Sequence, residues 1–160
     1  MTEIRLEHVS YAYDNEKILE DINLKVTSGE VVSILGPSGV GKTTLFNLIA
    51  GILEVQSGRI ILDGEENPKG RVSYMLQKDL LLEHKTVLGN IILPLLIQKV
   101  DKAEAIARAD EILATFQLTA VRDKYPHELS GGMRQRVALL RTYLFRHKLF
   151  LLDEAFSALD

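Results

Sequence analysis

A glycine-rich stretch between two apolar segments constrains the fold of this chain more than any other feature. Residues 36–44 read GPSGVGKTT, residues 31–35 before them (VVSIL) are almost continuously apolar, and apolar residues recur at helical spacing after them until Gly51. A continuous apolar run predicts a strand that is covered on both faces of a sheet. The spacing after the loop predicts a helix that ends at Gly51. The order of strand, loop and helix indicates an α/β protein in which residues 31–35 form a central strand of a parallel sheet.

The glycine-rich stretch matches the phosphate-binding pattern G-x-x-x-x-G-K-[ST]. Glycines let the backbone turn tightly and direct its N–H groups inward, and the following helix adds the positive end of its dipole. Lys42 would reach the β- and γ-phosphates of a nucleotide, and the Thr43 hydroxyl can bind Mg²⁺. A glycine-rich turn without a ligand is the alternative, which the flanking strand and helix disfavour. The predicted nucleotide-binding residues are Gly36, Pro37, Ser38, Gly39, Val40, Gly41, Lys42, Thr43 and Thr44.

Two acidic residues follow a second apolar run near the end of the sequence. Residues 149–154 read LFLLDE, which predicts a buried strand with Asp153 and Glu154 at its end. Asp153 would hold Mg²⁺ through water, and Glu154 could polarise a water molecule for attack on a γ-phosphate. Two solvated acids at a strand end are the alternative. The phosphate loop upstream favours the catalytic interpretation.

A second anion-binding device lies in residues 129–141, LSGGMRQRVALLR. Ser130, Gly131 and Gly132 stand where a helix is predicted to begin, and they offer a hydroxyl and backbone N–H groups to an anion. The phosphate loop already accounts for one nucleotide. The second device therefore either caps its own helix or binds a nucleotide that is held elsewhere.

These motifs, with Gln77 in YMLQKDLLL and the final SALD, resemble the ATP-binding subunits of ABC transporters along residues 2–160. The resemblance implies ATP and Mg²⁺ as cofactors and a head-to-tail dimer, in which Ser130 and the two glycines after it contact the partner subunit's ATP. It implies that Gln77 links Mg²⁺ and the attacking water to a helical insertion. It also implies that Tyr13 stacks on adenine, although Tyr11 competes for this role and a tyrosine packed in the core is the alternative.

The remaining patterns fit one α/β domain of the P-loop NTPase class. Alternating residues at 3–10 and 18–26 predict antiparallel strands, residues 58–64 and 70–76 predict two more, and residues 101–116 predict a helix. We expect one domain, 1–160, with an ATPase core at residues 1–77 and 126–160 and a helical subdomain at 78–125. The core would contain an antiparallel β subdomain and a mixed or parallel sheet flanked by helices.

Within the family the sequence resembles bacterial importers of nitrate, sulfonates, taurine or thiamine precursors. The resemblance implies an integral membrane permease as partner, a solute-binding protein acting indirectly, and a place on the cytoplasmic face of the membrane. The apolar residues of the helical subdomain would either contact this permease or form core; they are Val87, Ile91, Ile92 and Leu95. In the family a further strand and a histidine follow the SALD turn, so we expect a truncated form with an incomplete core sheet and defective hydrolysis.

The composition of the chain limits the classes of function that it can have. The net charge of −3 offers no electrostatic footprint for nucleic acid, and with no cysteine the chain has neither disulfides nor a thiolate nucleophile. The most apolar stretch, residues 87–97, is too short to cross a bilayer. A soluble ABC-type ATPase of DNA repair or translation is one alternative function, and a non-catalytic nucleotide-binding fragment is the other.

Overall fold

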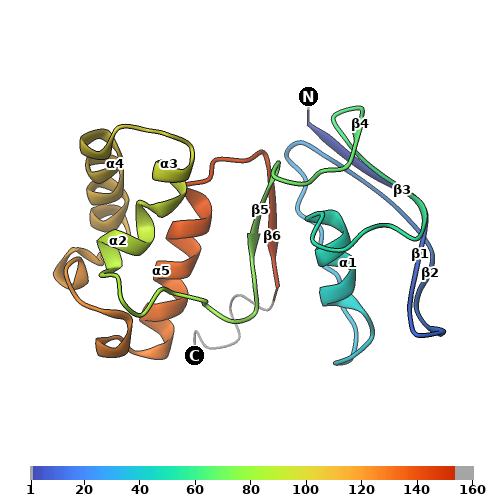
Figure 1. Cartoon of the computed structure of the whole chain (residues 1–160), viewed down its shortest axis with the longest axis horizontal. Coiled ribbons are helices and arrows are strands. Elements are labelled where there is room, and N and C mark those ends of the chain that lie inside the picture. The colour runs from blue at the N-terminus through green and yellow to red at the C-terminus, as the bar shows by residue number, and fades with distance from the viewer. Residues whose placement is uncertain (1, 154–160) are drawn as a thin grey trace. The chain divides into compact units, whose positions relative to one another are not determined.

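The computed structural model describes residues 2–153, and these divide into two units. One unit comprises the described residues up to Val72 together with His147–Asp153, and the other comprises Ser73–Arg146. The first unit contains β1 (Glu3–Tyr13), β2 (Glu16–Thr27), α1 (Lys42–Ile49), β3 (Ser57–Leu62), β4 (Glu65–Glu66) and β6 (Leu149–Leu152) (Figure 1). The second contains α2 (Val87–Ile91), α3 (Leu93–Ile97), α4 (Lys102–Thr115), the 3₁₀ turns Thr119–Val121 and Pro126–Glu128, and α5 (Gly131–Tyr143). Strand β5 (Val72–Met75) begins at the last residue of the first unit's main segment.

The main sheet of the first unit has the strand order β2-β1-β3-β4, and its neighbouring strands are antiparallel. In its register Leu6 of β1 lies opposite Leu24 of β2 and Ile60 of β3. Alternate side chains of β1 face the core, where Ile4 and Leu6 are buried. The period-two pattern predicted two antiparallel strands here, and the structure confirms them.

Helix α1 follows the glycine loop as predicted. Its buried side chains are Leu45, Leu48 and Ile49, which recur at helical spacing. The helix ends before Gly51, whose φ of 69° lies in the left-handed region that stops a helix. The helix therefore contributes an apolar face to the core of the first unit and leaves its N-terminus at the loop.

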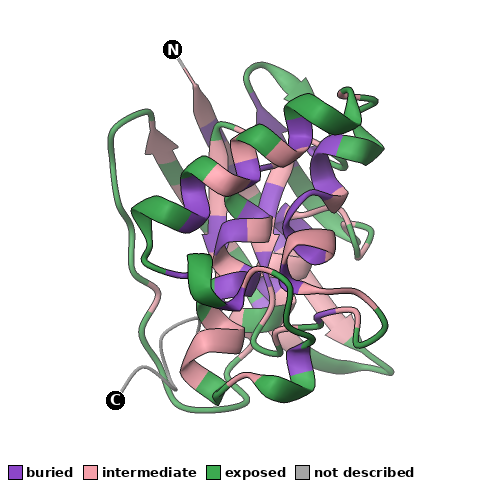
Figure 2. Cartoon of the chain, turned by 90° about the vertical axis from the view of Figure 1, so that its left-hand side faces the viewer, coloured by how far each residue is buried: buried purple, intermediate pink, exposed green. Residues whose placement is uncertain are grey.

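The helices of the second unit bury one face each. Helices α2 and α3 both pack against α4 and α5, and Figure 2 shows buried stretches alternating with exposed ones along the helices. The apolar residues weighed above as a permease contact, Val87, Ile91, Ile92 and Leu95, are all buried. They form core, and the interface interpretation of these side chains is wrong. None of the described helices is long and apolar enough to cross a membrane.

Residues 31–35 do not form the predicted central strand. Val31 is 95% exposed and Leu35 is 91% exposed. An extended run becomes a strand only where neighbouring strands take up its backbone hydrogen bonds, and none of the described strands pairs with this run. The prediction of a central strand is wrong here, because an apolar composition does not by itself supply a strand to pair with.

Candidate nucleotide-binding site

The glycine loop adopts a backbone conformation that requires glycine. Gly41 is the N-cap residue of α1 and has a φ of 98°, in the left-handed region that other residues rarely adopt. A Cβ atom at Gly41 would lie 2.8 Å from Ile18 Cγ2 and 3.1 Å from Leu19 Cδ2 on β2. Glycine at this position therefore permits both the turn into the helix and the close approach of the loop to the sheet.

The N-terminus of α1 has no side-chain cap among the described residues. The other two long helices have a side-chain cap. Asp101 accepts hydrogen bonds from the first turn of α4, and Ser130 accepts one from the first turn of α5. The first N–H groups of a helix have no partner within the helix, and they carry its positive dipole end. At α1 these groups are therefore left to bind an anion such as a phosphate.

The Lys42 ammonium group lies at the beginning of the loop. Nζ donates hydrogen bonds to the carbonyl oxygens of Gly36 at 2.8 Å and Pro37 at 2.9 Å. An ammonium group has three N–H donors, so one remains for a phosphate oxygen. The first two residues of the loop thus hold the ammonium group in place.

The Thr43 hydroxyl meets the second predicted motif in space. Thr43 Oγ1 donates a hydrogen bond of 2.7 Å to Asp153 Oδ2, although the two residues are 110 positions apart in the sequence. Asp153 lies just after β6 and is 2% exposed. Hydroxyl and carboxylate oxygens are the hard donors that Mg²⁺ prefers, and Mg²⁺ is commonly held by one or two protein ligands together with phosphates and water. The two side chains therefore fit a nucleotide-bound Mg²⁺.

Replacing Thr43 with valine tests this contact. The variant leaves a buried carboxylate oxygen without its hydroxyl donor, so the free energy of unfolding should fall by about 1–3 kcal/mol. Urea denaturation followed by circular dichroism measures the change. Thr44→Val makes the same substitution one residue later and should cost less than about 0.5 kcal/mol. Equal losses in both variants would contradict a specific role for the Thr43–Asp153 hydrogen bond.

Tyr13 lies at the exposed end of β1. It is 45% exposed, whereas Tyr11 is half-buried, and the two rings meet edge to face with their centroids 5.0 Å apart. The Gln56 side chain holds the strand between them, since it accepts from Ala12 N at 2.8 Å and donates to Ala12 O at 3.0 Å. Of the two tyrosines, Tyr13 has more of its ring free to stack, and its contact with adenine stays a prediction.

The other predicted site residues lie in the second unit or outside the described residues. Gln77 is exposed and follows β5, and Glu154 falls outside the described residues. Ser130 caps its own helix, because its Oγ accepts from Met133 N at 3.3 Å. A Cβ atom at Gly131 would meet no atom of the described residues within 4 Å, so packing among those residues does not require glycine there. A contact of this helix terminus with a partner's nucleotide stays a prediction.

An ion pair joins the connection after β5 to helix α5, and no sequence pattern predicted it. We call residues 76–86 the β5–α2 connection. Arg134 on α5 makes a bidentate pair with Asp79 of this connection, with Nε–Oδ2 at 2.9 Å and Nη2–Oδ1 at 3.0 Å. Burial raises the pKa of the Asp79 carboxyl, but hydrogen bonds from Arg134 and Leu81 N and the charge of Arg141 outweigh it, so the pKa lies below its usual value. No local pattern could pair residues 55 positions apart.

A second missed residue, Asn90, holds the other half of this connection. Its side chain is completely buried. Oδ1 accepts from Leu82 N at 2.7 Å, and Nδ2 donates to the carbonyl oxygens of Leu82, Lys85 and Thr86 at 3.0–3.1 Å. The sequence signal was an amide within an apolar stretch, which predicts a buried polar group with partners.

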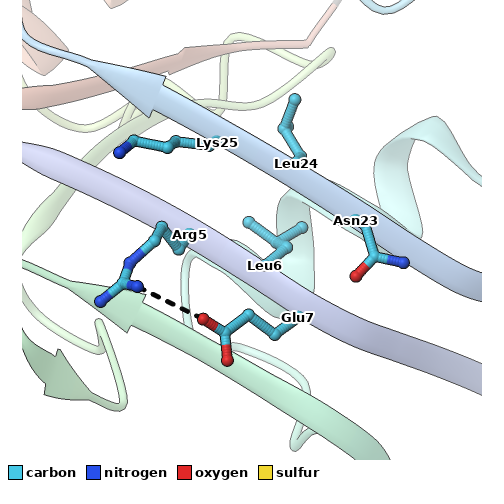
Figure 3. Close-up of a pocket in the computed structure, with 6 residues that line it drawn as sticks. All are labelled: Arg5, Leu6, Glu7, Asn23, Leu24 and Lys25. Atoms are coloured by element: carbon cyan, nitrogen blue, oxygen red, sulfur yellow. Dashed lines mark hydrogen bonds and ion pairs between the residues drawn. The ribbon is translucent and has the colours of Figure 1, made fainter.

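A shallow depression on the main sheet is a different feature from the site. Figure 3 shows Arg5, Leu6 and Glu7 on β1 beside Asn23, Leu24 and Lys25 on β2. Its charged groups pair on the sheet surface: Arg5 contacts Glu7 at 3.5 Å, and Lys25 contacts Glu3 at 2.8 Å. These ion pairs occupy the charges that a ligand would need, so we assign no site here.

Comparison with known proteins agrees with this geometry. The sequence model of the family described as "ABC transporter" matches residues 19–157, which include the loop, Asp153 and the helix start at Ser130. The chain belongs to the ABC transporter family. This membership confirms the predicted class of an α/β P-loop ATPase domain that contains an antiparallel sheet and helices.

Relatives within the ABC family cover the whole chain. It is 42% identical to the spermidine/putrescine import ATP-binding protein PotA of Aggregatibacter actinomycetemcomitans over 98% of its length. It is 43% identical over 100% of its length to YtlC of Bacillus subtilis, an uncharacterized ABC transporter ATP-binding protein, and 41% identical over 98% to the sulfate/thiosulfate import ATP-binding protein CysA of Thermosynechococcus vestitus. The chain spans about half the length of the curated relatives it matches, namely 44% of PotA, 48% of CysA and 64% of YtlC.

Proposed function

We propose that this chain binds Mg²⁺ and ATP and hydrolyses ATP to power solute import. The defective hydrolysis expected above is the alternative, which turnover of ATP by the full chain would exclude. The hydrogen bond between Thr43 and buried Asp153 carries the proposal, because it joins the phosphate loop to the strand-end carboxylate. The uncapped N-terminus of α1 and the Lys42 ammonium group supply N–H donors for phosphate. Together these groups can bind a ligand that carries phosphates and a hard divalent cation.

Each residue has a separate part in this reaction. The first-turn N–H groups of α1 and Lys42 Nζ bind phosphate oxygens and offset their charge. Thr43 and Asp153 hold Mg²⁺, which when bound supplies positive charge beside the phosphates. Glu154 and Gln77 are the proposed groups that orient the attacking water, and Tyr13 is the proposed adenine contact.

The proposed partners follow from family membership. PotA is a spermidine/putrescine import protein, and CysA is a sulfate/thiosulfate import protein. We extend to this chain an integral membrane permease, a solute-binding protein acting indirectly, and a second ATP-binding subunit arranged head to tail. In that dimer Ser130, Gly131 and Gly132 contact the partner's ATP, and the complex lies at the cytoplasmic face of the membrane. An importer of nitrate, sulfonates, taurine or thiamine precursors is the finer proposal, and PotA and CysA are named for other solutes.

The metal dependence of ATP binding tests the proposal. A fluorescent ATP analogue is titrated against the full chain with Mg²⁺ and with EDTA, and Mg²⁺ should raise the affinity at least about tenfold. Asp153→Asn should remove most of this gain and leave the affinity in EDTA within about twofold of the original, because it changes a metal ligand and leaves the phosphate contacts. The same dependence on Mg²⁺ in both proteins would contradict the proposed site.

A further inference from the structure

Two arginines of α5 bind the first half of the β5–α2 connection. Arg134 holds the Asp79 carboxylate with two hydrogen bonds, and its Nη2 also donates to Glu83 Oε1 at 2.7 Å. Arg141 Nη2 donates to Asp79 O at 2.7 Å, and its Nη1 donates to Leu80 O at 2.8 Å. The connection is therefore attached to α5 through both side chain and backbone.

These contacts hold the connection in a conformation that it would not favour alone. Leu80 has a φ of 46°, in the left-handed region where a side chain costs about 1–2 kcal/mol. Its carbonyl oxygen and that of Asp79 both bind Arg141. The second half of the connection is held separately by Asn90 of α2. The conformation of the residues that directly follow Gln77 thus depends on contacts with α5.

Arg134 also belongs to the first turn of α5. Its backbone N–H donates to Ser130 O at 2.9 Å, so one residue bonds to Ser130 through its backbone and to Asp79 through its side chain. Asp79 comes two positions after Gln77 in the sequence. A short path of two hydrogen-bonded contacts therefore leads from the serine at the helix start to the segment that carries Gln77.

We infer that Arg134 is a positioning residue, which through Asp79 makes the segment after Gln77 move together with the Ser130 end of α5. The inference rests on the proposed ATPase function and adds to it the route by which engagement of Ser130 would reach Gln77. A partly exposed ion pair contributes little to stability, and the side chains of Arg134 and Asp79 are 23% and 22% exposed. The main effect of the bidentate geometry is to orient Asp79, because a planar guanidinium group fixes the carboxylate in one orientation.

A matched ion pair in the same unit provides the control. Arg122 binds Asp110 of α4 with Nε–Oδ1 at 2.6 Å and Nη2–Oδ2 at 3.3 Å. Both pairs are bidentate, and both arginines are partly exposed, at 28% for Arg122 and 23% for Arg134. The Arg122 side chain pairs with Asp110 and Asp123, and neither residue belongs to the β5–α2 connection. Arg122→Gln therefore removes a comparable interaction without releasing that connection.

Hydrogen–deuterium exchange and ATPase kinetics of the full chain test the inference together. Arg134→Gln should speed exchange of the amides at residues 77–83 about tenfold and leave those of α4 unchanged. It should lower kcat for ATP about tenfold and change KM less than about twofold, because the phosphate loop is intact. Arg134→Lys should give intermediate values, since lysine keeps the charge and loses the bidentate geometry. Arg122→Gln should leave both readouts within about twofold of the original.

The ion pair between Arg134 and Asp79 predicts that the effects of two substitutions on kcat are not additive. Because Arg134 and Asp79 act through each other, Asp79→Asn with Arg134→Gln should be no slower than the slower single variant. Additive losses, or a kcat for Arg134→Gln equal to that of Arg122→Gln, would overturn the inference. If the unmodified chain shows no turnover, the ATPase proposal fails by itself, and the exchange rates still decide whether Arg134 holds the segment after Gln77. Unchanged exchange at residues 77–83 would then overturn the inference.

Discussion

Replacement of Lys42 with methionine should lower the affinity for ATP with Mg²⁺ about 100-fold. The ammonium group is held at the start of the loop by Gly36 O and Pro37 O, with one N–H donor left for phosphate. Methionine keeps the unbranched side chain up to the ε position and removes the charge and all three donors. A charge-assisted hydrogen bond contributes about 1.5–3 kcal/mol, and every 1.4 kcal/mol is about tenfold in affinity. Isothermal titration calorimetry with ATP and Mg²⁺ measures the loss.

Lys25→Met is the matched control for Lys42. Lys25 lies in the same unit on β2, where its ammonium group pairs with Glu3 at 2.8 Å. Its replacement removes an equal charge from the unit, so it separates a general electrostatic effect from a contact with the nucleotide. We expect the control to bind ATP within about twofold of the original affinity. A similar loss in both variants would show that Lys42 acts only through net charge.

Replacement of Asn90 with alanine should destabilise the second unit by about 3–5 kcal/mol. The side chain is completely buried and makes four hydrogen bonds to the backbone of residues 82–86. Alanine leaves the N–H of Leu82 without this acceptor and removes a donor from three carbonyl oxygens. Each buried polar group left unsatisfied costs about 1–3 kcal/mol. Urea denaturation measures the free energy of unfolding, and the change should exceed that of any exposed substitution in this unit.

Gln98→Ala serves as the control for Asn90. Gln98 also bears a side-chain amide in the second unit, but its side chain is exposed and donates to a single carbonyl, Phe145 O, at 2.8 Å. Its replacement should cost less than about 1 kcal/mol, because water can take over an exposed hydrogen bond. If Asn90→Ala is no more destabilising than Gln98→Ala, the hydrogen bonds of Asn90 do not hold the connection.

Elements with local signals were predicted well. The Asp101 cap and the apolar stripe after it predicted α4, and Ser130 with its glycines predicted the start of α5. Capping and helical periodicity depend on residues within a few positions of each other, so they can be recognised in the chain itself. The loop at residues 36–44 belongs to the same group, because its glycines meet a local requirement for positive φ, as at Gly41.

Burial and pairing were predicted poorly where they depend on distant residues. Residues 31–35 have the composition of a central strand, yet a strand exists only beside a partner. Val87 and Ile91 could have been core or surface by their spacing, and packing against α4 and α5 decides for the core. Asp79 and Arg134 are unremarkable charges in the sequence, and only the fold joins them.

The chemical groups of the site can be identified from the sequence: a glycine loop with a lysine and a threonine, a carboxylate after an apolar strand, and a serine with two glycines at a helix start. Its motifs are local because tight turns and helix termini impose requirements on consecutive residues. Two contacts appear only in the folded chain: Thr43 Oγ1 lies 2.7 Å from Asp153 Oδ2, and Arg134 binds the segment after Gln77. Contacts between residues far apart in the chain depend on the packing of whole elements, because no local rule relates their positions.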